Sequence, residues 1–176
     1  MQVAARTTVE YGEGVLRIAA PPTNQVLGAS GSLEVTVQLP AGSRIEATAA
    51  GAEIRGVGRL GDVTVESSHG PITLDEAASA HLTTAAGDVS VGRLTGPAEI
   101  AVAKGDIGIT EAVHGTVVLR TQVGDVTVGA AAGVSASLDA GTSSGRIHNA
   151  LRNADGAADL TIHATTAQGD ITARSL

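Results

Sequence analysis

The sequence predicts an all-β chain, a single-domain β-solenoid of about seven stacked coils with about 19 residues each. Three observations predict this class. A glycine recurs at a nearly constant interval, apolar and polar residues alternate around each of these glycines, and Tyr11 is the only aromatic residue among 176. Small branched side chains and 23 glycines suit a narrow layered interior better than a wide globular one.

The recurring glycine gives the period of the repeat. It stands at positions 51, 70, 87, 105, 124, 145 and 169, with steps of 19, 17, 18, 19, 21 and 24. Near-identical segments follow it, such as GDVSV from Gly87 and GDVTV from Gly124. Such a unit is too short for a helical crossover between parallel strands, so we expect strands and short turns alone. Coils stacked roughly 4.8 Å apart would share one aliphatic core. An antiparallel sandwich is the alternative, because Gly-Asp turns also close hairpins.

The elements follow from this period. Strands are expected at residues 7–10 and 15–18, a loop at 20–31 and a strand at 32–39. Together these form an irregular N-terminal cap, residues 1–42, which belongs to the same domain as the repeat array at 43–176. Within the array, alternating aliphatic residues precede and follow each turn, as Ile100 and Val102 precede Gly105 and Ile107 follows it. The wide last step predicts an insertion loop or a short helical turn at 148–156.

Charge and composition exclude several classes of protein. Eleven Lys and Arg against 18 Asp and Glu give a net charge of −7, which does not suit nucleic acid or an anionic membrane. The chain has no cysteine, so disulfides and thiolate metal sites are excluded. No apolar signal core and no run of transmembrane length occur, so we expect a cytoplasmic protein without membrane insertion. A chain from which a leader had been removed would fit the cell surface equally well.

The repeat units resemble one known family. The glycine-phased units, the LPAGS stretch at 39–43 and the GDIT stretch at 169–172 resemble the β-strand-repeat proteins of domain of unknown function 4097 (DUF4097), often labelled adhesins. The GRIHN stretch at 145–149 resembles the variant of actinobacterial members, and the likeness runs from Val15 to the end. The resemblance implies a repeat fold with no established enzymatic activity.

A column of carboxylates is the first candidate for chemistry. An aspartate follows the turn glycine in four units: Asp88, Asp106, Asp125 and Asp170. Such a column would suit Ca²⁺, which prefers oxygen ligands. However, the Gly-Gly-x-Gly-x-Asp nonapeptide of calcium-binding β-rolls is missing, and Asp is common in turns because it accepts backbone N–H bonds. We therefore expect no metal, with this column as the one weak calcium candidate.

Catalytic patterns are not found. The five histidines show no zinc-like spacing, and neither a Gly-x-Ser-x-Gly elbow nor a phosphate-binding loop occurs. For His148, a hydrogen bond that organises the following loop is a better hypothesis than catalysis. A polysaccharide lyase would need long loops, clustered acids or bases and aromatic subsites. We expect no catalytic residue, no cofactor and no enzyme activity.

The sequence favours a non-catalytic structural or binding module that presents polar faces to a protein or cell-envelope partner. The outward candidates for this contact are Glu66, His81, Glu99, Arg120, Asp139 and His163. The alternative is a self-assembling scaffold. In that hypothesis Ile171, Thr172 and Ala173 form the open edge of the terminal coil and join copies into homo-oligomers.

Overall fold

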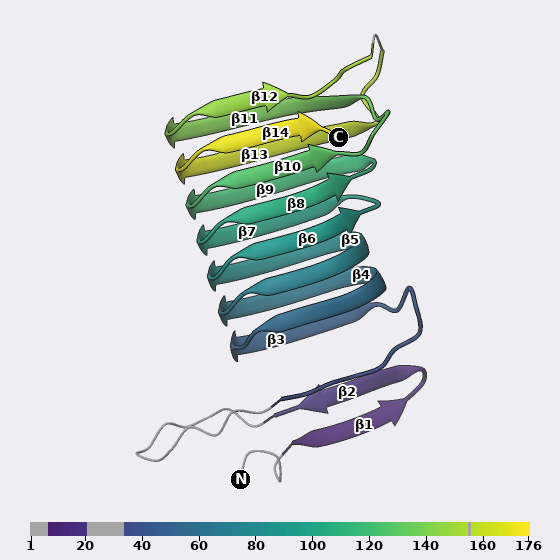
Figure 1. The fold of residues 1–176 in the computed structure, drawn as a ribbon. Helices are drawn as coiled ribbons and strands as arrows, with labels where there is room; N and C mark the ends of the chain where they lie inside the picture. Colours follow the sequence, from purple (N-terminus) through teal and green to yellow (C-terminus); the bar gives the residue numbers. More distant parts are fainter. Residues whose placement is uncertain (1–6, 21–33, 155) are drawn as a thin grey trace. The chain divides into compact units, whose positions relative to one another are not determined.

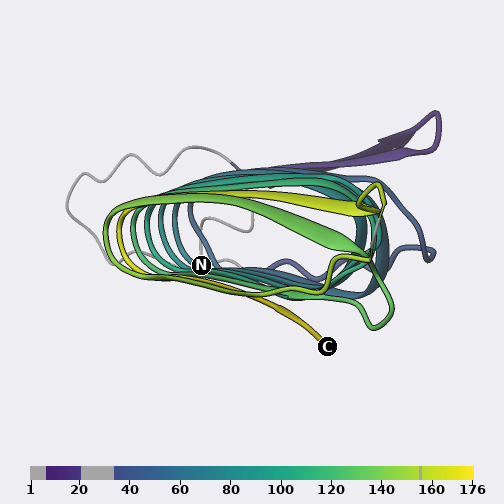
Figure 2. The same cartoon turned by 90° about the horizontal axis from the view of Figure 1, so that it is seen from above.

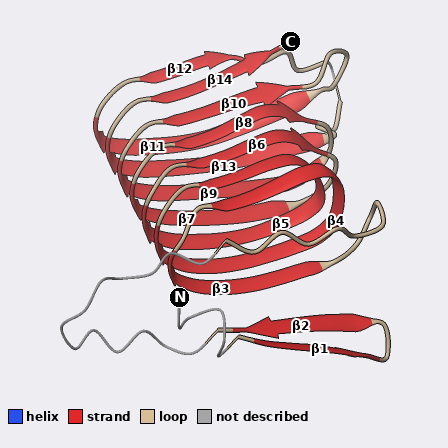
Figure 3. Cartoon of the chain, turned by 60° about the horizontal axis from the view of Figure 1, so that its bottom comes forward, coloured by secondary structure: helices blue, strands red, loops and turns tan. Residues whose placement is uncertain are grey.

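The computed structural model describes residues 7–20, 34–154 and 156–176, and the regular elements in these ranges are all β-strands (Figure 3). By its internal contacts the chain divides into two compact units, residues 1–39 and 40–176. None of the described residues belongs to a helix that is long and apolar enough to cross a membrane.

The first unit contains an antiparallel hairpin. Its strands are β1 (Thr8–Gly12) and β2 (Val15–Ala19), close to the two strands expected there. The strand predicted at 32–39 is wrong over its described part, since residues 34–39 carry no strand. Val35 and Val37 alternate with polar residues, but they are 49% and 39% exposed, so the apolar side of this alternation is not buried. Apart from Ala20, the loop predicted at 20–31 lies outside the described residues.

The second unit is one sheet of twelve parallel strands wound into a coil (Figure 1). Its strands are β3 (Ile45–Gly51), β4 (Ile54–His69), β5 (Ile72–Ala86), β6 (Val89–Leu94), β7 (Ala98–Lys104), β8 (Ile107–Ala112), β9 (Gly115–Val123), β10 (Val126–Ala130), β11 (Ala136–Ser144), β12 (Ile147–Ala150), β13 (Leu160–Gln168) and β14 (Ile171–Ser175). All strand pairs in this unit are parallel, which excludes the antiparallel sandwich.

The coils of this unit have two faces. The first face runs in the order β3, the C-terminal halves of β4 and β5, then β7, β9, β13 and β11. The second face runs through the N-terminal halves of β4 and β5, then β6, β8, β10, β14 and β12. Viewed from above, the coils superpose as flattened loops (Figure 2). Each strand therefore presents one side to the interior and the other to water.

The order of stacking differs from the order of the chain. The last coil in sequence, β13–β14, lies between β9–β10 and β11–β12, because Ile171 pairs with Val126 on one side and with Ile147 on the other. Figure 1 shows β11 and β12 as the outermost strands beyond β13 and β14. The prediction that Ile171, Thr172 and Ala173 form an open edge is wrong, since neighbouring strands occupy both sides of β14.

The turn glycines are required by the closeness of successive coils. A Cβ at Gly105 would lie 2.3 Å from the carbonyl oxygen of Gly87, and its φ of +147° is one that side chains rarely adopt. The same contact recurs from Gly124 to Gly105, from Gly169 to Gly124 and from Gly145 to Gly169, which follows the stacking order rather than the chain order. The predicted glycine phase therefore corresponds to a corner of the coil that has room for no side chain. Gly51 is not part of this corner.

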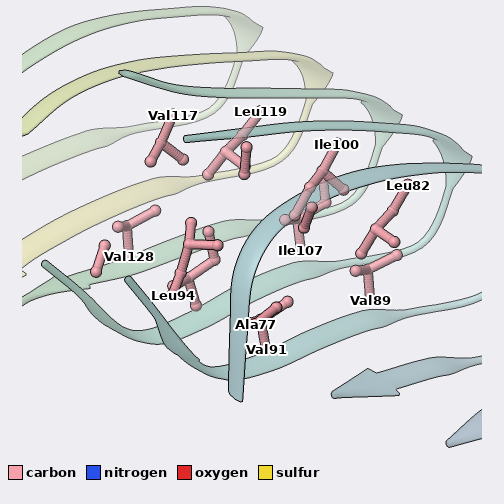
Figure 4. Packing of buried hydrophobic residues seen from close by; sticks show 14 of the residues in the cluster. Ala77, Leu82, Val89, Val91, Leu94, Ile100, Ile107, Val117, Leu119 and Val128 are labelled. Atoms are coloured by element: carbon pink, nitrogen blue, oxygen red, sulfur yellow. The ribbon is translucent and has the colours of Figure 1, made fainter. Parts of the chain in front are cut away.

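The core is a set of aliphatic columns. Leu82, Ile100 and Leu119 occupy adjacent positions on the first face and are all fully buried, as are Val91 and Ile107 on the second (Figure 4). Burial of this kind stabilises a chain by about 1.5–3 kcal/mol for each large aliphatic side chain. The interior is only one side-chain layer wide on each face, which explains how the second unit folds without any aromatic residue.

Candidate functional site

Five of the six predicted contact residues gather in two groups on the first face. Parallel pairing in register places equivalent residues of successive strands in straight columns. One column contains His81, Glu99, Val118, His163 and Asp139, taken in stacking order from β5 to β11. Arg120 lies in the neighbouring column, two residues further along β9. The polar residues of this face are therefore held in fixed positions by the backbone ladder.

Glu99 is the centre of the first group. Its carboxylate oxygen Oε1 accepts a hydrogen bond from Arg120 Nη1 at 3.2 Å, and Oε2 lies 3.7 Å from His81 Nδ1. The three side chains are 49–61% exposed, so solvent screens the attraction and the pairs add little to stability. Their effect is to orient the three side chains on the surface.

His163 and Asp139 form the second group. His163 Nδ1 lies 3.3 Å from Asp139 Oδ2, across the junction between β13 and β11. Together with Val118, Arg120 and Thr165 they line a hollow of about 280 Å³ on this face. The apolar Val118 therefore separates two charged groups, and this mixture of small apolar area and oriented polar groups is typical of surfaces that contact proteins.

Glu66 does not join this cluster. It lies in the column of Arg120, but β5 and β7 separate their strands, with Thr83 and Ala101 at the intervening positions. Stacked strands are about 4.8 Å apart, which puts Glu66 roughly 14 Å from Arg120 along the column. We define the first-face cluster as His81, Glu99, Val118, Arg120, Asp139, His163 and Thr165.

The aspartates of the turns form a hydrogen-bonded ladder. The carboxylate oxygen Oδ1 of Asp88 accepts the backbone N–H of Asp106 at 3.0 Å, and Asp106 accepts that of Asp125 at 2.8 Å. Asp125 accepts the N–H of Asp170 at 2.7 Å, although 45 residues separate them in sequence. Each carboxylate therefore joins one coil to the next, as expected of Asp as a turn residue. One oxygen of each carboxylate is occupied by this bond, which leaves fewer oxygens for a cation.

Arg146 ends the ladder. Asp170 Oδ1 accepts the backbone N–H of Arg146 at 2.8 Å, and Oδ2 accepts a hydrogen bond from its guanidinium at 3.0 Å. The backbone N–H, followed by the guanidinium, holds the pKa of the Asp170 carboxyl below its ordinary value of 3.8. The pair fastens the outermost coil to its neighbour and gives the ladder no further carboxylate.

Buried hydroxyls form a second ladder inside the same corner. Thr121 donates to the carbonyl oxygen of Gly105, Thr166 to that of Gly124 and Thr142 to that of Gly169, each at 3.0 Å. Thr121 and Thr166 are nearly fully buried, at 6% and 5% exposed. These threonines satisfy the glycine carbonyls at each turn, so their hydroxyls have a structural role.

The hydrogen bond that was expected from His148, one that organises the following loop, is made by the adjacent residue Asn149. Asn149 Oδ1 accepts the backbone N–H of Leu151 at 3.0 Å and so shapes the start of the loop after β12. His148 lines a second hollow of about 380 Å³ with Arg146, Ile147 and three residues of β13–β14: Asp170, Ile171 and Thr172. The segment predicted as a loop or helical turn at 148–156 begins instead as the end of β12, and the described residues that follow, 151–154 and 156–159, form a loop.

Sequence reasoning missed the pairing of Arg146 with Asp170 and the role of Asn149. The signal was present, because Arg146 stands where four other units carry aspartate. Asn149 stands in the same register as Ala173 and Val128, which point into the core. Both departures from the repeat occur in the coil that lies outermost.

The chemistry available to this surface is polar contact. Within the described ranges, no three side chains of His, Asp or Glu converge to hold a metal ion. The side-chain nitrogen and oxygen atoms that are buried in the described residues all have hydrogen-bond partners. The polar groups therefore either stabilise the turns or lie exposed on the faces.

Comparison with known proteins gives one match. The family model described as Toastrack DUF4097 matches residues 9–175. No curated protein and no solved structure matches the chain. The matched range covers the hairpin and the whole coil stack, including the glycine corner and both aspartate-bearing and arginine-bearing turns. The chain belongs to the Toastrack DUF4097 family.

Proposed function

We propose that this protein is a non-catalytic binding module, whose coil stack holds the first-face cluster in fixed register for contact with a protein or cell-envelope partner. The observation that carries the proposal is the arrangement of Glu99 with Arg120 and of His163 with Asp139 around Val118. These groups are exposed, oriented by each other and attached to strands that are paired on both sides, apart from Asp139 on β11.

The remaining polar groups support this choice of face. The aspartate ladder and the buried threonines are engaged in bonds between coils. On the second face, one exposed column consists of small residues such as Ser90, Gly108 and Thr127, which offer little for specific recognition. A second column carries the ion pairs of Arg59 with Glu76 and of Arg93 with Glu111, without a hollow beside it among those described. The first face combines an Arg side chain, Arg120, with the apolar Val118 around one hollow, a combination that is enriched in protein contacts.

The test uses the full chain as immobilised bait, with retained molecules identified by mass spectrometry. A binding partner must be lost when Arg120→Ala and His163→Ala are combined, because these changes remove the guanidinium and the imidazole that line the hollow. It must be retained by the matched control Ser90→Ala with Thr127→Ala, which changes only the second face. Retention that is equal for both variants would contradict the proposal.

The scaffold hypothesis required an open edge at Ile171, Thr172 and Ala173, and β14 has a paired strand on each side. These residues lie between two paired strands, so assembly through them would first require β12 to leave.

A further inference from the structure

The outermost coil of the second unit is an excursion in the sequence. β10 pairs directly with β14 and β9 with β13, although residues 131–159 lie between the two coils in the sequence. Within this segment, β11 and β12 lie on the far side of β13–β14 from β9–β10 (Figure 1). The stack is therefore closed at this end by a segment that is internal to the chain.

This coil is built differently from the ones that it covers. Ile147 is 46% exposed, whereas its register partners Ile171 and Val126 are 1% and 0% exposed. Asn149 stands where Ala173 and Val128 fill the core. The amide at this exposed position accepts the backbone N–H of Leu151 from the adjoining loop through its oxygen. A coil with this composition suits the end of the stack, because a further coil would bury its polar side chain.

The same coil also interrupts the ladder of carboxylates. Asp88, Asp106, Asp125 and Asp170 each offer an oxygen to the backbone N–H of the next coil. Arg146 has no carboxylate oxygen to offer to a further coil, and its guanidinium donates a hydrogen bond to Asp170 instead. Charged residues and polar inward residues are the features by which sheets avoid pairing edge to edge with another chain.

The following loop completes the closure. The backbone carbonyl oxygen of Arg152 accepts the N–H of Ala136. The backbone carbonyl oxygen of Ser135 accepts the N–H groups of both Asp159 and Leu160. Ser175 at the end of β14 accepts the N–H of Arg152 through its hydroxyl oxygen. The excursion is thus tied at both its beginning and its end to the coil beneath it.

We propose that β11, β12 and the described residues of the loop after them (151–154 and 156–159) form a built-in end cap, which prevents a second copy of this chain from adding to the coil β13–β14. Without this cap, β13 and β14 would present a repeat-like end: unpaired backbone groups, the aliphatic Ile162 and Ile171, and the carboxylate of Asp170 as an acceptor. The cap replaces that end with Arg146, Asn149 and a hydrogen-bonded loop.

The experiment converts the cap into an ordinary repeat coil within the full chain. Arg146→Asp restores the carboxylate of the ladder, and Asn149→Val restores the aliphatic residue. Successive aspartates at the preceding turns show that this charge arrangement is tolerated in the stack. The matched control, Arg120→Asp with Thr127→Val, makes the same charge change and a similar apolar gain at mid-stack positions. Both variants and the parent are compared by size-exclusion chromatography with light scattering across the micromolar range, with far-UV circular dichroism to verify the fold.

We expect concentration-dependent dimers or longer species from the end variant alone, with monomers for the parent and the control. Amide hydrogen exchange on the parent should show faster exchange in β12 than in β14, as the cap is outermost. A folded end variant that remains monomeric would overturn the proposal. So would a parent protein that associates with added protection of the amides of β11 and β12, because the cap would then be an adhesive surface.

Discussion

Ile171 and Ile147 provide a direct test of the stacking order. Both follow a turn glycine by two residues, and they are paired in register on adjacent coils. A stack in chain order would bury Ile147 and place Ile171 at the end. The structure has the reverse, with Ile171 1% exposed and Ile147 46% exposed. Replacing each by alanine in turn therefore separates the two arrangements by the free energy of unfolding.

The magnitudes follow from burial. Ile171→Ala removes a fully buried side chain between two paired strands and leaves a cavity, which costs about 3–4 kcal/mol. For Ile147 about half of the residue remains in water and the space left is open to solvent, so only a reduced transfer term remains, about 1 kcal/mol. The predicted difference of roughly 2 kcal/mol is well above the error of a denaturation experiment.

The assay is guanidinium unfolding followed by far-UV circular dichroism, because Tyr11 lies in β1 and the coil stack has no aromatic reporter. Both variants should unfold with the same dependence on denaturant as the parent, so that the midpoints can be compared. If Ile147→Ala costs as much as Ile171→Ala, or more, the inserted position of β13–β14 is refuted.

Three further predictions concern the turns. The pKa of Asp170 is lowered in the folded state, so its contribution to stability is present above about pH 3.8 and is lost as the pH falls through the folded-state value. Amide exchange should therefore show loss of protection in β12 before β10 on acidification, and Asp170→Asn should abolish this difference. Gly105→Ala should destabilise the protein by more than about 2 kcal/mol, since strain and a backbone clash combine. Gly141→Ala, which meets nothing within 4 Å, should leave the melting temperature nearly unchanged. Added Ca²⁺ should also leave the melting temperature unchanged, because the carboxylates of the ladder accept backbone N–H bonds; a rise would contradict this assignment.

Much of the architecture could be predicted from the sequence, for a physical reason. A Cβ at Gly105 would lie 2.3 Å from the backbone of the neighbouring coil, so glycine is needed there and the corner of the coil is marked in the sequence. Alternating aliphatic residues such as Ile107 and Ile109 then fix which side of each strand faces inward. Local patterns and the global fold agree over most of the second unit, which is why the repeat was recognisable.

The order of the last two coils could not be predicted from the period. The glycines at 145 and 169 mark equivalent corners, and either could follow Gly124 in the stack. Which of the two coils is outermost depends on Asn149 and Arg146, because these residues suit an outermost coil and would be unfavourable between two other coils. Both residues lie in the GRIHN stretch, whose sequence suggested only a family resemblance and a loop hydrogen bond of His148. The strand predicted at 32–39 failed because alternation reports which side chains are apolar and says nothing about whether a partner strand is present.

The position of β14 also has a mechanical consequence. In a solenoid stacked in chain order, tension applied to the last strand peels a single ladder of hydrogen bonds, one coil at a time. Here β14 pairs with β10 on one side and β12 on the other. A force applied at Ser175 must therefore break two ladders together and slide an inner coil out from between its neighbours. The C-terminal strand is anchored as firmly as a strand in the middle of the stack, which makes it a strong point of attachment for a load.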